Sequence, residues 1–312
     1  MLHKRKEFHS EIDELISQAS HFIAESRMKD AYECLDRALA LDFDHPDVLA
    51  GLKYINFWQG RIQSAINQVE LIDQAEALLH HWKDFTRFIS GFPSSEALVE
   101  SFRKLIFTRV HDLFSGIGSG EADPDIQLWL GIASKGIGNY EQALEHLQQA
   151  VQAGSPRGRL LSELADIYAL IGEEQKARVM FREAFFQDPQ DIDIEAFEAE
   201  LFVRLCDQVR DTGLDSPEIL EWIPVYGTLW GVLSIKRELR ALEYGKLRQK
   251  IFSLEQEIRD DNRRPLLMPR LINHYFWLID HLVMNREDQR KIDEILLKIR
   301  SLSPEVYKRY TN

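Results

Sequence analysis

The residues of this sequence that have the chemistry for metal binding or proton transfer include several histidines. His80 and His81 are adjacent and point to different sides of a helix, whereas His274 and His281 are seven residues apart and can share one face. Neither pair has a third ligand and an acid at the offsets that zinc sites use. The spacing favours core or surface histidines, and we predict no metal ligands.

Nucleophilic and acid–base chemistry has equally little support. Cys34 and Cys206 form no CxxC pair, which is typical of a reducing compartment or of buried thiols. No serine or cysteine stands in a recognisable nucleophile motif. Paired carboxylate catalysis requires one acid in an apolar pocket, whereas the clustered acids here fall on a solvated helix face: Glu195, Glu198 and Glu200. We predict no catalytic residue and no cofactor.

One glycine-rich segment, within Ser115–Asp125, has the spacing of glycines that some phosphate-binding loops show. A phosphate loop follows a strand and opens a helix, but here a helix is expected before the segment. Glu121, Asp123 and Asp125 would also repel a phosphate. The segment is therefore predicted to be a loop that joins two helices.

The elements that must position these residues show a repeat. Asn139–Gly154 and Glu173–Asp188 share a spacing of small and apolar residues, 34 positions apart. The matching pairs are Ala143 and Ala177, Leu147 and Phe181, Ala150 and Ala184, Leu130 and Leu164, Gly131 and Ala165, Gly138 and Gly172. Helices approach to about 8–10 Å only where small residues meet, and a glycine closes a helix in a left-handed cap. The pattern predicts two helical hairpins, and Pro189 follows the second.

This pattern resembles the tetratricopeptide repeat, most clearly over residues 124–190. A weaker copy spans 12–79, where Ala31, Leu35 and Ala38 would be followed 34 residues later by Ala65, Val69 and Ile72. The resemblance implies an all-α fold, a right-handed solenoid of helical hairpins. We expect it to occupy residues 1–211, with a C-terminal helical bundle over 212–312.

Charge is distributed unevenly along the chain. The net charge is -13, which opposes general nucleic-acid binding. Residues 236–312 carry 17 Lys and Arg against 12 Asp and Glu, whereas residues 1–235 carry 21 against 39. The two parts face either different partners or each other.

The resemblance also implies a binding surface, because in tetratricopeptide proteins the first helix of each pair forms a groove that holds a peptide or helix of a partner. By phase, the groove residues would be Asp125, Leu128, Ile132, Lys135, Arg159, Ser162 and Asp166. The alternative is that these positions are solvated or filled by the protein's own helix.

A second candidate surface lies in the longest apolar stretch, Trp222–Ile235. It is too short to span a bilayer, which takes roughly 20 residues. Trp222, Tyr226 and Trp230 recur every four residues, so they would form a stripe on one helix face. From Pro224 to about residue 260 we expect one long helix. The stripe is either core, or it docks a partner or a membrane surface with the help of the basic residues Lys236, Arg237 and Arg240.

The sequence therefore predicts a non-catalytic scaffold or adaptor that binds other proteins. One alternative is a self-regulated module whose groove is covered by its own C-terminal helices, and another is a helical enzyme with a site between repeats and bundle. We find no signal peptide and no transmembrane segment, and expect a cytoplasmic protein. The partner and the oligomeric state are not specified by these patterns.

Overall fold

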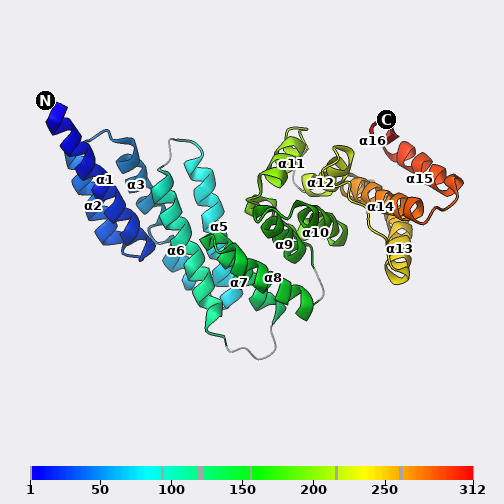
Figure 1. Ribbon diagram of the computed structural model, residues 1–312, viewed down its shortest axis with the longest axis horizontal. Helices are drawn as coiled ribbons and strands as arrows, with labels where there is room; N and C mark the ends of the chain where they lie inside the picture. The colour runs from blue at the N-terminus through cyan, green and yellow to red at the C-terminus, as the bar shows by residue number, and fades with distance from the viewer. Residues whose placement is uncertain are drawn as a thin grey trace. The chain divides into compact units, whose positions relative to one another are not determined.

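The computed structural model describes residues 2–92, 95–117, 123–154, 157–214, 217–259 and 263–311, with side chains from residue 10 onward. All regular elements of these residues are helices, so the predicted all-α class is confirmed (Figure 1). The chain divides into two compact units, Met1–Ala153 and Gly154–Asn312. The predicted boundary between 211 and 212 falls inside the second unit, and a separate domain over 212–312 stays a prediction.

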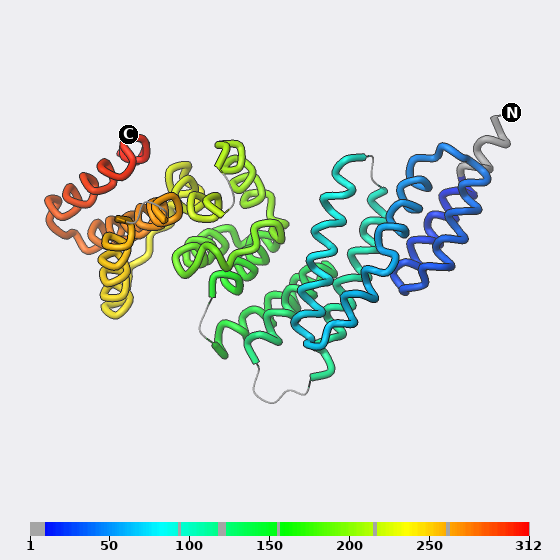
Figure 2. The backbone as a smooth tube through the Cα atoms, turned by 180° about the vertical axis from the view of Figure 1, so that it is seen from behind, coloured from blue at the N-terminus to red at the C-terminus, as the bar shows by residue number. Residues whose placement is uncertain are grey.

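The first unit is a set of antiparallel helices that packs around buried alanine, leucine and aromatic side chains. Its helices are α1 (Leu2–Ala24), α2 (Met28–Leu41), α3 (Pro46–Trp58), α4 (Arg61–Ile66), α5 (Leu71–Ile89), α6 (Glu96–Ser115), α7 (Pro124–Ile137) and α8 (Tyr140–Ala153). Helix α6 packs against α1 as well as against α5 and α7 (Figure 2). The last of the six helices that precede the α7–α8 hairpin therefore packs against the first.

The hairpin α7–α8 forms for the reason that the sequence suggests. A Cβ atom at Gly131 would lie 2.6 Å from the Leu147 side chain, so the two helices meet where the first has no side chain. Gly138 ends α7 with a φ of +87°, and the amide of Asn139 donates to the carbonyl of Ser134 at 2.8 Å. This left-handed cap satisfies carbonyl groups that the helix end would otherwise leave open.

The weaker copy departs from the repeat pattern in its second half. Ala31, Leu35 and Ala38 are fully buried in α2, and Ala65 is buried in α4. However, α4 has only 6 residues and ends at Ile66 before completing two turns. As a result Val69 and Ile72, which match the core positions Leu35 and Ala38, are 89% and 43% exposed.

The second unit begins with the other predicted hairpin and continues into a helical bundle. Its helices are α9 (Gly158–Leu170), α10 (Glu174–Gln187), α11 (Glu200–Arg210), α12 (Glu218–Leu229), α13 (Ala241–Glu257), α14 (Arg264–Met284), α15 (Gln289–Leu302) and α16 (Pro304–Thr311), with short 3₁₀ turns η1 (Pro189–Asp191) and η2 (Ile194–Ala196). Ala177, Phe181 and Ala184 of α10 are fully buried, as the repeat requires.

The C-terminal helices pack around α14, so the predicted bundle is confirmed. Helix α14 contacts α12, α13 and α15, and α16 packs on α15 and α12 (Figure 1). Its buried positions lie on all sides from Leu267 to Leu282. Within the bundle, Arg270 of α14 pairs with the buried Glu221 of α12. The buried pair of Arg182 of α10 and Asp280 of α14 joins the bundle to the hairpin.

The expected long helix from Pro224 to residue 260 is wrong. Helix α12 ends at Leu229, and the connecting segment, residues 230–240, runs without regular structure to the start of α13. Arg178 of α10 donates to the carbonyl of Val232 at 3.0 Å, and Arg182 donates to the carbonyl of Ile235. These side chains bind carbonyl groups that a continuous helix would use internally.

Candidate functional site

The predicted groove residues of α7 are mostly buried. Asp125 is partly exposed in the first turn of the helix, where its amide donates to the Asp123 carboxylate at 2.9 Å. Leu128, Ile132 and Lys135 are each at most 4% exposed. The structure therefore places the accessible part of this set at the start of α7.

The predicted groove residues of α9 interact with the segment that follows the repeat. The amide of Arg159 donates to the Asp191 carboxylate at 2.9 Å, and the Ser162 hydroxyl donates to the carbonyl of Arg159 at 2.9 Å. The Asp166 carboxylate is fully buried and accepts from the amides of Glu198 at 3.0 Å and Ala199 at 2.9 Å. Helices α7 and α9 belong to different units, so each half of the predicted groove is described by itself.

The Asp166 contacts also define where α11 begins. The sequence shows apolar spacing from Ile192 onward, but the α-helix starts only at Glu200. The carboxylate of Asp166 accepts hydrogen bonds from backbone amides at the start of α11, as the side chain of an N-cap residue does. Residues 189–199 form η1, η2 and extended backbone along α9 instead.

The aromatic stripe forms as predicted on α12. The rings of Trp222 and Tyr226 are 5.4 Å apart, and those of Tyr226 and Trp230 stack at 5.0 Å. Exposure rises along the stripe from 8% at Trp222 to 37% at Trp230. Burial, and then the charge of Glu305 on α16, raise the pKa of Tyr226, so the phenol stays neutral. The stripe combines a core end and an accessible end.

Two of the basic residues beyond the stripe, Lys236 and Arg237, form ion pairs within the second unit. Arg237 binds Glu183 of α10 and Glu243 of α13, the latter at 3.0 Å. The Lys236 ammonium lies 3.5 Å from the buried Asp280 carboxylate. These charges hold the connecting segment in place, which gives the membrane-docking interpretation no support.

The histidine and cysteine side chains that the sequence offered for chemistry include buried groups. Burial lowers the pKa of His274 to about 4, and the ring nitrogen Nδ1 lies 2.7 Å from the carbonyl of Arg270. Burial raises the pKa of the Cys206 thiol to about 12, and both cysteines are free. Within the described ranges, the histidines, cysteines and acids form no group that could hold a metal ion. Residues 118–122 of the glycine-rich segment lie outside the described residues.

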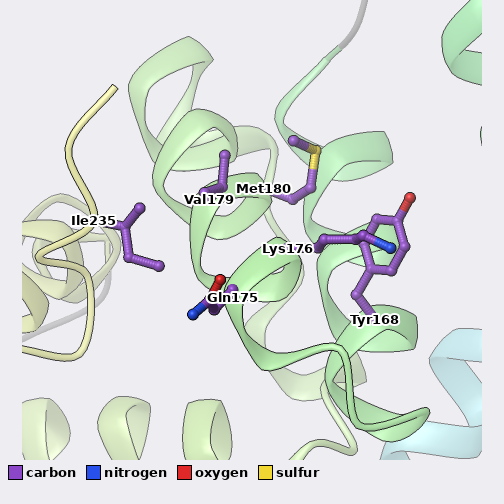
Figure 3. A pocket seen from close by; sticks show the side chains of 6 residues that line it. All are labelled: Tyr168, Gln175, Lys176, Val179, Met180 and Ile235. Carbon is purple, nitrogen blue, oxygen red and sulfur yellow. The ribbon is translucent and has the colours of Figure 1, made fainter. Parts of the chain in front are cut away.

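An open recess of about 590 Å³ lies beside α10, and we call it the α10 recess. It is lined by Tyr168, Gln175, Lys176, Val179, Met180 and Ile235. Figure 3 shows Ile235 of the connecting segment across from Val179, while the Lys176 side chain lies beside the Tyr168 ring at 5.6 Å. Sequence reasoning missed this site because Ile235 was expected within a long helix.

A second recess, of about 440 Å³, lies in the first unit, and we call it the acidic recess. It is formed by the start of α5, the end of α6 and the start of α7. Its lining residues are Glu70, Leu71, Ile72, Asp73, Phe114, Ile117, Asp123, Asp125, Ile126 and Trp129. Of the predicted groove residues, Asp125 reaches this recess.

Comparison with known proteins agrees with the geometry. The family model described as tetratricopeptide repeat matches residues 138–201, which cover α8, both helices of the second hairpin and the start of α11. The chain therefore contains tetratricopeptide-type repeat sequence over residues 138–201. A comparison with curated proteins found no match. Repeats of this family generally mediate protein–protein interactions and are generally not catalytic. In the part of the chain that the structure describes, no helix has the length and apolar character to cross a membrane.

Proposed function

We propose that this protein is a non-catalytic scaffold that binds partner polypeptides, and that the α10 recess is a docking site. The observation that carries the proposal is the position of this recess on the second helix of the repeat that the family model matches. Pockets of roughly 300–1,000 Å³ with apolar walls and few polar groups are typical binding sites. The α10 recess has these properties.

The lining defines the kind of partner segment. Val179, Met180 and Ile235 offer apolar surface, and methionine adapts its shape to different side chains. Lys176 stands exposed at the rim, 3.2 Å from the Glu173 carboxylate at the surface. Surface pairs of this kind are weak, so Lys176 can exchange Glu173 for a carboxylate of the partner. A segment with a large apolar side chain beside an acid fits the recess.

A quantitative capture experiment tests the proposal. Val179→Asp places a charge in the recess, and Leu297→Asp makes the same change on the exposed face of α15. Partners bound to the recess are lost by the first variant and retained by the second, as measured by mass spectrometry of proteins captured on the purified full chain. Equal capture by wild type and Val179→Asp contradicts the proposal.

The predicted peptide groove on α7 and α9 remains part of the proposal in a restricted form. Because Leu128, Ile132 and Lys135 are buried, a partner reaches them only after a rearrangement. The accessible contact on α7 is then its first turn around Asp125.

Self-regulation is a second candidate function, and the contacts of Asp166 favour it. Residues 189–199 run along α9, the first helix of the second hairpin, and hydrogen-bond to its Arg159 amide and its Asp166 carboxylate. This covering segment differs from the C-terminal helices that the sequence suggested. Replacing Asp166 and Asp191 by alanine is expected to release the segment and increase partner capture. Unchanged or reduced capture by the folded variant contradicts this second function.

A helical enzyme has no support from the two recesses, since neither brings a histidine together with an acid in its lining. We place the protein in the cytoplasm as part of the proposal. Two buried, free cysteines support that placement, because reducing compartments keep thiols unpaired.

A further inference from the structure

The acidic recess is built from the start of α5 and, more than 40 residues later in the sequence, from the end of α6 and the start of α7. Its floor consists of Phe114 of α6 and Trp129 of α7, whose rings stack at 5.8 Å with an angle of 4° between their planes. Both side chains are buried. A floor of two stacked and packed rings fixes the shape of the recess before any ligand arrives.

The walls of the recess expose apolar side chains that the fold has left uncovered. Leu71 and Ile72 of α5 and Ile117 after α6 are each more than a third exposed, and Val69 stands nearby in the chain. Single exposed apolar residues are ordinary, but several around one concavity mark a binding surface. This cluster exists because α4 stops early, which leaves Val69 and Ile72 outside the core.

The rim carries negative charge. Glu70 and Asp73 flank the apolar residues of α5, while Asp123 and Asp125 lie at the start of α7. Asp123 already serves as the N-cap of α7, and acids in the first turn favour a helix N-terminus. Among the described residues that line the recess, none is basic. A partner that brings cations meets attraction on both sides of the apolar floor.

We propose that the acidic recess binds a partner segment in which a large apolar side chain is flanked by lysine or arginine. The apolar side chain lies on the Phe114–Trp129 floor between Ile72 and Ile117, and the cations pair with Glu70 and Asp73. The argument is charge complementarity around an apolar concavity. This site lies in the other compact unit from the α10 recess and takes a partner of opposite charge, so it stands independently of the function proposed above.

The test uses the full chain and a fluorescent synthetic peptide, an amphipathic helix of leucine and lysine. Two matched peptides replace all lysines by glutamate or all leucines by serine. Fluorescence anisotropy at low salt is expected to show binding of the leucine–lysine peptide, and both replacements are expected to weaken binding by about tenfold or more. Added salt should weaken binding of the leucine–lysine peptide, because the rim charges are exposed.

Variants of the chain locate the site. Ile72→Ser together with Ile117→Ser removes apolar wall, and the isosteric pair Glu70→Gln and Asp73→Asn removes charge without changing shape. Each pair is expected to lower the affinity by about three- to tenfold. The matched controls are Phe43→Ser, which alters an exposed aromatic ring elsewhere in the unit, and Glu33→Gln with Asp36→Asn on the exposed face of α2.

The outcomes are distinct. Binding that falls in the recess variants and persists in the controls and in Val179→Asp supports the proposal, whatever the result at the α10 recess. Absent binding, equal binding of the leucine–glutamate peptide, or equal weakening by the controls overturns it. Self-association of the chain that is lost in Ile72→Ser also overturns it, because the occupant would then be a second copy.

Discussion

The Asp166 carboxylate accepts a hydrogen bond of 2.9 Å from the backbone amide of Ala199, the N-cap residue of α11. A side chain from α9, the first helix of the second hairpin, thus defines where α11 begins. The same carboxylate accepts from the amide of Glu198, and it is fully buried.

Removal of this buried cap should destabilise the protein. Asp166→Ala removes the acceptor of the buried Ala199 amide and of the partly buried Glu198 amide, and we expect a loss of about 2–3 kcal/mol in the free energy of unfolding. Asp166→Asn keeps one acceptor oxygen and should cost less. Glu200→Ala, on an exposed side chain in the first turn of α11, is the control and should stay within about 0.5 kcal/mol of wild type. Urea denaturation measures all three, and equal effects of Asp166→Ala and Glu200→Ala would refute the role of the cap.

The buried pair of Arg182 and Asp280 should show strong coupling. The Arg182 guanidinium also lies 4.4 Å from the centroid of the Trp277 ring. Asp280→Ala leaves an uncompensated buried cation and is expected to cost about 3–5 kcal/mol. Arg182→Leu combined with Asp280→Ala removes both charges and should cost less than Asp280→Ala alone. Chemical denaturation of Arg182→Leu, Asp280→Ala and the double variant gives the coupling free energy as a double-mutant cycle. Additive effects of the two single changes would show that the pair is not coupled.

Two glycine substitutions should have opposite signs. In Gly131→Ala the new Cβ would meet the Leu147 side chain at 2.6 Å, which forces α7 and α8 apart and costs about 1–3 kcal/mol. Gly245 lies within α13 with no atom within 4 Å of an added Cβ. Gly245→Ala should stabilise the protein by about 0.5–1 kcal/mol, since alanine favours helix. Thermal melts of both variants provide the comparison, and a neutral Gly131→Ala would mean that the helices do not meet at this point.

Stability should depend on His274 in mildly acidic solution. Its pKa falls from an ordinary 6.5 to about 4 because burial disfavours the imidazolium. The unfolded chain therefore takes up this proton first, and stability declines as the pH drops from about 6.5 to about 4, by up to about 3 kcal/mol. Above pH 6.5 the group has no effect.

The measurement is the unfolding free energy as a function of pH in wild type and in His274→Asn, whose amide can replace the Nδ1 donor. The difference between the two curves should appear only in the acidic window. Parallel curves between pH 4 and 6.5 would show that His274 is already accessible to protons in the folded protein.

Local spacing in the sequence was sufficient to predict the hairpins. Gly138 and Gly172 both adopt a positive φ, and Ala143, Ala150, Ala177 and Ala184 are fully buried. These positions are predictable because the contact between two consecutive helices depends on residues that lie close in the sequence. The aromatic stripe on α12 was predictable for the same reason.

The candidate sites were not predictable, because distant side chains create them. The α10 recess exists because Arg178 and Arg182 hold the connecting segment in a non-helical course. The acidic recess exists because α4 ends after Ile66, although Ala65 fits the repeat. In both cases the local pattern indicated regular helix, and the structure departs from that pattern.

Site-specific photo-crosslinking tests the scaffold most directly. A benzophenone amino acid is placed at Met180 in the α10 recess, or at Leu297 on the exposed face of α15 as the control. The account predicts discrete crosslinked partners from position 180 that are absent from position 297 and that disappear when Val179→Asp is added. No adduct at position 180, or the same adducts at both positions, would contradict a partner-docking role for this repeat.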